Sequence, residues 1–173
     1  MPCRGRVLES PCGPLVLLVD ERQSVTGLHF ARDRPPAPDC PDWDGMPVVW
    51  DDAATAAAAA QIDEYFAGAR RRFELALAPV GPPFRQRVWA ALREIPWGDT
   101  ISYGELARRI GNPGAARAVG RANGANPIAI IVPCHRVIGA DGSLVGFGGG
   151  LDNKEILLQH EGLPIRRQGR LAL

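Results

Sequence analysis

The sequence has no long apolar stretch. Its longest run of aliphatic residues, from Leu15 to Val19, has five members, whereas a membrane-spanning helix needs roughly 20 apolar residues. No basic segment followed by an apolar one stands at the start, so we expect no secretory signal peptide. The sequence therefore predicts a protein that has no membrane partner.

Cysteine is scarce as well. The four cysteines, Cys3, Cys12, Cys40 and Cys134, are scattered and do not follow the pattern of a disulfide-bonded scaffold. Reduced thiols in a cytoplasmic protein are the simpler interpretation. The first three, even when combined with His29, match no closed zinc-site spacing, so we interpret them as packing or surface residues and expect no bound metal.

What the chain does have is the composition of a globular protein. Its 173 residues are 46% apolar and 23% charged, enough to bury a core in one domain or two small ones. The net charge of +1 conceals a division. Residues 1–80 carry 8 Arg and 12 Asp or Glu, hence −4, whereas residues 81–173 carry 11 Arg, one Lys and 7 Asp or Glu, hence +5. The reversal suggests that a polyanion would meet the second half.

The first half is predicted to be a small α/β domain. Short segments rich in Val and Leu predict strands, and a stretch rich in Pro and Asp predicts a loop. An alanine-rich segment predicts a helix, with Asp51 or Asp52 as its cap and Gly68 as its end. The elements are expected at residues 6–9, 15–20 and 24–30 for strands, 32–46 for the loop, 53–68 for the helix and 70–78 for a further strand. We therefore expect a domain over residues 1–78 with a small antiparallel sheet and one helix.

The second half is predicted to be mostly α-helical. Residues 79–83, Pro-Val-Gly-Pro-Pro, predict a linker because they continue neither helix nor sheet readily. The segment from Ser102 to Glu105 is a capping box, and Asn112-Pro113 can cap and begin another helix. Helices are expected over residues 84–95, 102–110 and 113–123. Residues 84–173 should therefore form a second domain.

The helices expected at 102–110 and 113–123 form a helix-turn-helix pattern. Arg117 and Arg121 are four residues apart, and thus on one face of the second helix. Its other residues are nearly all small, so it has few groups that could read base edges. If the pair binds DNA, such a slim helix would approach it closely and recognise shape and backbone. An ordinary buried helix pair is the alternative, because Ala and Gly also permit tight packing.

The second half also contains a candidate nucleophile. The aliphatic run from Ile128 to Val132 predicts a buried strand, and it leads into Cys134-His135-Arg136. An adjacent His or Arg favours the thiolate form of a cysteine. Consecutive strand residues point to opposite faces, so a turn or a bridging water would be needed to couple Cys134 to His135. An inert buried cysteine is the alternative.

A glycine-rich loop follows the cysteine. Val145 to Gly150 surrounds Phe147 with glycines, which lets backbone groups approach a flat ligand. The loop lacks the spacing of a phosphate-binding loop. A capping box from Asp152 to Glu155 predicts a last helix that ends at Glu161. Glu161 could orient His135 in a nucleophile–base–carboxylate relay, or it could be a solvated residue of the last turn.

Taken together, these motifs resemble the O6-alkylguanine-DNA alkyltransferases, also called methylated-DNA–protein-cysteine methyltransferases. The most specific element is the segment Pro133-Cys-His-Arg-Val137. The resemblance covers residues 84–162 in register, whereas the first eighty residues match loosely, through Ser10 to Leu15. The other matching segments, in order, are residues 101–107, 111–120, 126–127, 145–150 and 160–162.

The resemblance implies direct DNA repair in one step. The family flips an O6-alkylated guanine out of the duplex and passes the alkyl group irreversibly to a cysteine, without a cofactor; O4-methylthymine is a second expected substrate. Carried over, Cys134 is the acceptor, His135 the base that acts on it through a water, and Glu161 the residue that orients His135. Tyr103 helps to rotate the nucleotide and donates a proton towards N3 of the leaving guanine. Asn126 pins the turn between the recognition helix and the active-site strand.

The resemblance also implies a DNA face and a pocket. Arg117 corresponds to the finger that enters the base stack in place of the flipped base. The accompanying DNA-binding residues are Arg121, Tyr103, Ala115, Ala116 and Gly120. The alkylguanine pocket is expected to comprise Pro133, Asn123, Val137, Phe147, Gly148 and Gly149. Some relatives carry Ser at Gly148 and a larger apolar residue at Asn123, which bears on the range of alkyl groups. The expected partner is duplex DNA containing O6-alkylguanine, bound by a monomer, with cooperative binding left open.

Two other functions compete with repair. A binding module could recognise alkylated bases without repairing them, but such relatives lack the acceptor cysteine that is present here as Cys134. A cysteine hydrolase could use Cys134, His135 and Glu161, and it would turn over repeatedly. That function leaves Arg117 and the paired helices unexplained.

Overall fold

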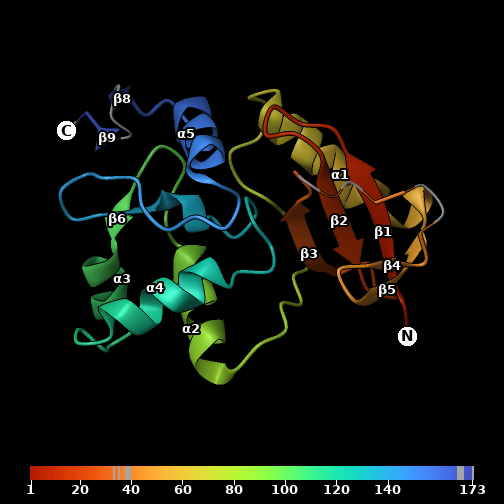
Figure 1. The fold of residues 1–173 in the computed structure, drawn as a ribbon, viewed down its shortest axis with the longest axis horizontal. Coiled ribbons are helices and arrows are strands. Elements are labelled where there is room, and N and C mark those ends of the chain that lie inside the picture. Colours follow the sequence, from red (N-terminus) through yellow and green to blue (C-terminus); the bar gives the residue numbers. More distant parts are fainter. Residues whose placement is uncertain (33, 35, 38–39, 167–169, 173) are drawn as a thin grey trace. The chain divides into compact units, whose positions relative to one another are not determined.

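The computed structural model describes residues 1–32, 34, 36–37, 40–166 and 170–172, and all structural statements refer to these residues. The chain divides into two compact units, Met1–Pro79 and Val80–Leu173 (Figure 1). The first contains a sheet and one long helix, and the second is mainly helical. None of the helices in the described part of the chain is long and apolar enough to cross a membrane.

The N-terminal unit is built on a five-stranded sheet with the order β3-β2-β1-β5-β4. The strands are β1 (Cys3–Leu8), β2 (Leu15–Val19), β3 (Val25–Phe30), β4 (Asp42–Trp43) and β5 (Met46–Trp50). Neighbours are antiparallel except for β1 and β5, which are parallel, so the expectation of an antiparallel sheet fails at this one pairing. The expected loop over 32–46 was also too long, because it includes β4.

The helix of this unit, α1 (Asp52–Phe66), packs against β1 and β2 (Figure 1). Asp51 is its cap and accepts a hydrogen bond from the backbone of Ala54 at 2.9 Å. The alanine-rich segment thus forms the predicted helix, and Ile62 and Tyr65 lie on its buried face. The strand expected over 70–78 is limited to one parallel bridge, between Leu77 and Val25.

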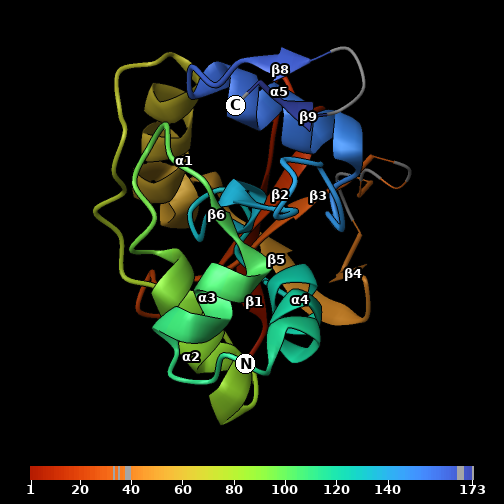
Figure 2. The same cartoon turned by 90° about the vertical axis from the view of Figure 1, so that its left-hand side faces the viewer.

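The C-terminal unit contains four α-helices, one 3₁₀ helix and two short two-stranded sheets among the described residues. The helices α2, α3 and α4 lie side by side (Figures 1 and 2). Trp89 of α2 donates from its indole nitrogen to the carbonyl of Ala122 in α4 at 2.8 Å. The elements are α2 (Pro83–Leu92), β6 (Ile101–Ser102), α3 (Tyr103–Arg109), α4 (Ala116–Gly124), η1 (Cys134–Arg136), β7 (Val137–Ile138), α5 (Leu151–His160), β8 (Ile165–Arg166) and β9 (Arg170–Leu171).

The capping motifs of this unit had different outcomes. Ser102 caps α3 as predicted, since its hydroxyl accepts from the backbone of Glu105 at 3.1 Å. Helix α4 begins later than predicted, because a turn closed by the Ala115 backbone and the Asn112 carbonyl at 3.0 Å precedes it. The capping box expected at the start of α5 is wrong: Gly150, with φ of 90°, holds the cap position and no side chain caps the helix.

The segment from Ile128 to Val132 is buried but is not the predicted strand. It turns back on itself, with the backbone of Val132 bonded to the carbonyl of Ile128 at 3.0 Å. Ile130 has a φ of 70°, a costly conformation for a β-branched residue. The strand prediction failed because a run of aliphatic residues predicts that a segment is buried but does not determine its backbone conformation.

Candidate active site

The 3₁₀ turn η1 presents three functional side chains in succession, Cys134, His135 and Arg136. Pro133 adopts φ of −81° and ψ of 64°, and the Cys134 backbone bonds to the carbonyl of Val132 at 2.8 Å. These values describe an inverse γ-turn. The turn replaces the strand alternation expected at Cys134 and His135. Successive residues of a 3₁₀ helix are about 120° apart around its axis and so do not point to opposite sides, as they would in a strand. His135 and Arg136 can therefore both reach one partner.

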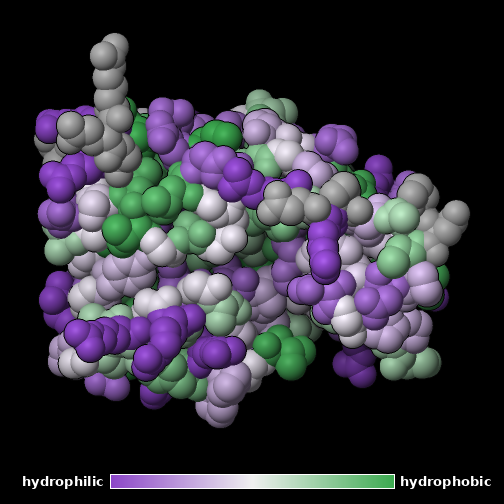
Figure 3. Space-filling view, viewed as in Figure 1, coloured by the Kyte–Doolittle hydropathy of each residue, from purple (hydrophilic) through white to green (hydrophobic). Residues whose placement is uncertain are grey.

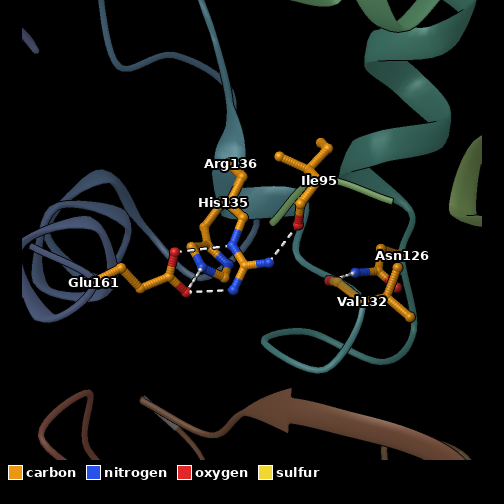
Figure 4. Close-up of polar contacts among 6 residues, drawn as sticks. All are labelled: Ile95, Asn126, Val132, His135, Arg136 and Glu161. Atoms are coloured by element: carbon orange, nitrogen blue, oxygen red, sulfur yellow. Dashed lines mark hydrogen bonds and ion pairs between the residues drawn. The ribbon is translucent and has the colours of Figure 1, made fainter. Parts of the chain in front are cut away.

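That partner is Glu161, the residue that ends α5 (Figure 4). His135 Nε2 lies 2.8 Å from Glu161 Oε1. Arg136 donates to both carboxylate oxygens, from Nε and Nη2, at 2.8 Å each. Its Nη1 also donates to the carbonyl of Ile95 at 2.6 Å. The three side chains are almost fully buried. Glu161, which is 25 residues from Arg136 in the sequence, supplies the negative charge of the site.

The electrostatics of this cluster define its protonation. Burial alone would raise the pKa of Glu161, but His135 and Arg136 together lower it well below its ordinary value, so the carboxylate is ionised. Burial lowers the pKa of His135, although Glu161 counteracts this, so the imidazole is neutral at pH 7. Because a carboxylate can only accept, Nε2 carries the hydrogen. His135 Nδ1 is then an acceptor, and it has no partner among the described residues.

Cys134 itself is 5% exposed. Burial raises the pKa of its thiol, while the side-chain amide of Asn126 and the charge of Lys154 lower it in part. Burial thus opposes the reactive thiolate, and the residues around the sulfur favour it. The balance between the two effects is a property of the folded site and not of the Cys-His dipeptide.

Asn126 also holds the turn that precedes the cysteine (Figure 4). Its Nδ2 donates to the carbonyl of Val132 at 2.8 Å and, more weakly, to that of Ile128 at 3.4 Å. Its Oδ1 accepts from the backbone of Ile128 at 3.0 Å. One amide therefore ties both ends of the irregular segment together.

Tyr103 and Asn123 approach the site from α3 and α4. The Tyr103 hydroxyl donates to the carbonyl of Val145 at 3.0 Å. Burial and the neighbouring Cys134 raise the pKa of Tyr103, so the phenol stays protonated at neutral pH. Asn123 donates to the carbonyl of Cys134 at 3.3 Å, and its buried Oδ1 has no partner in the described part of the chain.

The remaining pocket candidates differ in exposure. Pro133, Val137 and Gly149 are buried, Phe147 is half-buried and Gly148 is exposed. A Cβ atom at Gly148 would meet no atom closer than the carbonyl oxygen of Gly124, at 3.7 Å. The glycine loop therefore has room for a side chain at this position.

The DNA-binding candidates lie on or beside α4. Arg117 and Arg121 are exposed, and Ala115 and Ala116 form the start of the helix. Gly120 lies against the ring of Tyr103, where a Cβ atom would be 3.8 Å from two ring carbons. In Figure 3 a band of hydrophilic side chains crosses the lower left of the view, over α4, among paler residues.

The three cysteines of the N-terminal unit have surroundings of their own. Cys12 is buried, Cys3 Sγ lies 3.9 Å from Thr26 Oγ1, and Cys40 donates to the carbonyl of Asp42 at 2.6 Å. His29 packs on Trp43, with ring centroids 5.0 Å apart. No metal-binding group of His, Cys, Asp or Glu occurs among the described residues, and none of the four cysteines forms a disulfide bond there.

Two site residues were missed by the sequence analysis. Arg136 was interpreted as a group that favours the Cys134 thiolate, but its guanidinium is directed to Glu161 and Ile95. Lys154 was interpreted only as part of a capping box, yet it is fully buried, donates to the carbonyls of Val137 and Val145, and interacts electrostatically with Cys134. One signal was available, since Lys154 is the single lysine of the chain.

Comparisons with known sequences agree across both units. The family described as "6-O-methylguanine DNA methyltransferase, DNA binding domain" matches residues 83–163. The companion family, "6-O-methylguanine DNA methyltransferase, ribonuclease-like domain", matches residues 4–79. A curated "Methylated-DNA--protein-cysteine methyltransferase" of Methanosarcina acetivorans is 47% identical over 156 residues, 90% of this chain and 96% of the relative. The protein of the same name from Mycobacterium leprae is 50% identical over 156 residues, 90% of each chain.

Solved structures lead to the same family. The Mycobacterium tuberculosis O6-methylguanine methyltransferase superposes with a TM-score of 0.79 at 46% identity, covering 92% of each chain. The structure of "Mycobacterium tuberculosis OGT in complex with DNA" gives a TM-score of 0.80 at 47% identity, covering 91% of this chain and 92% of the other. The chain therefore belongs to the 6-O-methylguanine DNA methyltransferase family, the methylated-DNA–protein-cysteine methyltransferases of DNA repair.

Proposed function

We propose that this protein repairs O6-alkylguanine in duplex DNA by transferring the alkyl group to its own Cys134, once per molecule. The observation that carries the proposal is the buried arrangement of Cys134 beside His135 and Glu161. Family membership supports the reaction class. The residue roles, the stoichiometry and the flipping of the base are inferred from the chemistry of this site.

The first step is formation of the thiolate. With Nε2–H bonded to Glu161, His135 offers Nδ1 as the acceptor, and we assign it the thiol proton, taken through a water. The Cys134 sulfur then attacks the alkyl carbon, the carbon–O6 bond breaks, and its electron pair stays on the guanine. A thiolate suits this step because it is a soft and strong nucleophile. The thioether does not hydrolyse, so transfer is irreversible.

The leaving guanine must be neutralised as the bond breaks. Tyr103 is our candidate for this donor, which is supported by its protonated phenol and by its hydrogen bond to the backbone of Val145 in the glycine loop. We assign it a hydrogen bond, and then the proton, towards N3 of the guanine. Val137 and the loop from Phe147 to Gly149 supply backbone groups for the base.

Access to O6 requires a flipped base, because the atom lies inside the duplex. Helices α3 and α4 act as a helix-turn-helix, with α4 placed against the DNA. Arg117 fills the gap left by the base, and Arg121, Ala115, Ala116 and Gly120 line the same surface. The nearly featureless face of α4 suits an enzyme that must bind any sequence. Every group invoked comes from one chain, so the proposed reaction needs no second copy of the protein.

Two features bear on the range of substrates. The space at Gly148 permits alkyl groups larger than methyl, since a Cβ atom there would be 3.7 Å from its nearest neighbour. Asn123 brings a polar amide to a pocket where some relatives are apolar. O4-methylthymine remains a second proposed substrate, because it presents the same alkyl–oxygen bond.

The proposal is tested by incubating the protein with a duplex that contains one O6-methylguanine. Mass spectrometry should find a single methyl group per chain, on the peptide that contains Cys134, even with excess DNA. Cys134→Ser should accept no methyl group and should bind the duplex with nearly unchanged affinity. Repeated turnover, or methylation of Cys3, Cys12 or Cys40, would contradict the assignment.

A further inference from the structure

Lys154 is the one lysine of the chain, and it is completely buried. It lies in the first turns of α5, and its ammonium donates to the carbonyl of Val137 at 2.6 Å and to that of Val145 at 2.9 Å. It also lies 5.9 Å from the ring centroid of Phe147. A buried ammonium is costly unless its surroundings compensate the charge, so its presence needs an explanation.

The charges around Lys154 do not cancel. Arg136 and Glu161 neutralise each other through two hydrogen bonds, and His135 is neutral at pH 7. No carboxylate forms an ion pair with Lys154 among the described residues. With Cys134 protonated, the buried cluster therefore carries one excess positive charge. Lys154 donates to the carbonyl of Val137, the residue that follows the Cys134–Arg136 turn and whose N–H bonds to the Cys134 carbonyl. The ionisable group that interacts with its charge and can supply the matching negative charge is the Cys134 sulfur.

We propose that Lys154 is the counter-charge of the Cys134 thiolate, and that it acts through Cys134 as a positioning residue. The inference rests on the proposed function, in which Cys134 is the acceptor. Lys154 also joins two walls of the site, because its two hydrogen bonds connect the end of η1 and β7 with the glycine loop. A charged ammonium at this place stabilises the ionised sulfur before transfer, and it has no such partner once the sulfur is alkylated.

The titration behaviour agrees with this geometry. Burial lowers the pKa of Lys154 to about 8, and the Cys134 charge acts in the opposite direction. Burial raises the pKa of Cys134, and Lys154 is one of the groups that lower it. The other groups near the pair are His135, which is neutral, and Tyr103, whose hydroxyl shares the Val145 carbonyl with Lys154. Lys154 thus supplies the positive charge close to the sulfur that Glu161 does not neutralise.

The competing explanation is that Lys154 only clamps Val137 to Val145. Replacing Lys154 by Gln retains a hydrogen-bond donor without the charge, and replacing it by Met retains the length alone. If the charge acts on Cys134, both variants shift the thiol titration upwards. If Lys154 is only a clamp, the variants lose activity equally at every pH and the titration does not move.

The experiment measures the alkylation rate of Cys134 by iodoacetamide between pH 6 and pH 10, read by mass spectrometry of the Cys134 peptide. We expect Lys154→Gln and Lys154→Met to raise the apparent pKa of Cys134 by about one to three units. Glu155→Gln, a charge change at the next residue of the same helix, should leave the curve in place. Curves of the Lys154 variants that coincide with the wild type would overturn the proposal.

A reciprocal measurement avoids any variant at Lys154. Two interacting charges shift each other equally, so removing the thiol should change the titration of the lysine. In Cys134→Ser we expect the pKa of Lys154, followed by nitrogen NMR of its ammonium, to fall below that of the wild type. An unchanged Lys154 titration would refute the pairing. Failure of the proposed function is distinguishable, because the wild type would then accept no methyl group at Cys134 from O6-methylguanine DNA.

Discussion

The C-terminal unit carries two sets of charged residues that behave differently. On α4, Arg117 and Arg121 are exposed. Around η1, Arg136, Glu161 and Lys154 are buried and bonded to one another or to backbone carbonyls. The exposed set has the geometry to reach a partner, whereas the buried set has the geometry to control protons and charge.

The difference predicts two kinds of response. At 0.1 M salt the interaction between two exposed charges is largely screened once they are more than about 10 Å apart. The contacts of α4 with DNA should therefore weaken as the salt concentration increases. Buried charges are screened far less, so the reaction at Cys134 should respond to pH more than to salt. Free O6-benzylguanine separates the two, because a free base needs the reacting centre and not the DNA face.

The largest expected effect comes from Glu161→Gln. The variant leaves the Arg136 guanidinium buried without its counter-ion, and it replaces one of the two oxygens that accept from His135 and Arg136 with an NH2 donor. We expect transfer to slow by about 100-fold or more, equally for duplex and for free O6-benzylguanine. The free energy of unfolding should fall by about 3 kcal/mol. Rapid-quench transfer assays and denaturant unfolding measure the two effects; a loss confined to duplex would contradict the role.

The same variant has a defined pH dependence. The folded pKa of Glu161 lies below its ordinary value, so its stabilising contribution is complete at neutral pH and is lost as the pH falls through the lowered folded pKa. The stability difference between the wild type and Glu161→Gln should therefore be constant from pH 7 down to the ordinary carboxyl range and shrink below it. Unfolding curves over this range test the prediction. A difference that grows towards low pH would be inconsistent with an ionised, paired Glu161.

Tyr103→Phe should give an intermediate effect, since Tyr103 contacts both regions. It lies against Gly120 of α4 and bonds to the glycine loop. Without the phenol, transfer should slow by roughly tenfold to 100-fold for duplex and free base alike, because the leaving guanine loses its proton donor. Single-turnover rates with both substrates measure this. An unchanged rate with free base would remove the donor role.

Arg117→Ala should affect duplex alone. Extrusion of a base costs a few kcal/mol, so loss of the group that fills the gap should slow transfer from duplex by about tenfold to 100-fold. Transfer from free O6-benzylguanine should not change. Arg22→Ala, which removes an exposed charge from the N-terminal unit, is the matched control and should leave both rates as they are.

The smallest effect is expected from Arg121→Ala. A single phosphate contact contributes about one unit to the dependence of log affinity on log salt. The variant should bind duplex a few-fold more weakly and show a shallower salt dependence. Binding titrations at several salt concentrations measure the slope. A slope that matches the wild type would place Arg121 away from the phosphates.

Local features of this fold were predictable from sequence, and long-range ones were not. The Ser102 cap and helix α1 follow from patterns within a few residues, and both are present. Strand β5 was not anticipated, although Val48, Val49 and Trp50 are typical strand residues. Its parallel pairing with β1 joins segments that are far apart in the sequence. The turn over Ile128–Val132 was missed because Asn126 holds it through side-chain bonds that no hydrophobic pattern reports.

The site shows the same limit. His135 and Glu161 could be paired in advance through the family motif, and the structure brings them together at 2.8 Å. The roles of Arg136 and Lys154 could not be predicted, because each depends on a carbonyl or carboxylate supplied by a distant segment. The sequence of a motif does not show whether a charged residue is neutralised by a neighbouring group or acts on the nucleophile.

The most direct test of the division between the two regions compares two variants on two substrates. The ratio of the transfer rate from O6-methylguanine duplex to that from free O6-benzylguanine is measured for Arg117→Ala and Glu161→Gln. The ratio should fall by about tenfold or more for Arg117→Ala and stay at the wild-type value for Glu161→Gln. Equal ratios for both variants would contradict the separation of the DNA face from the reacting centre.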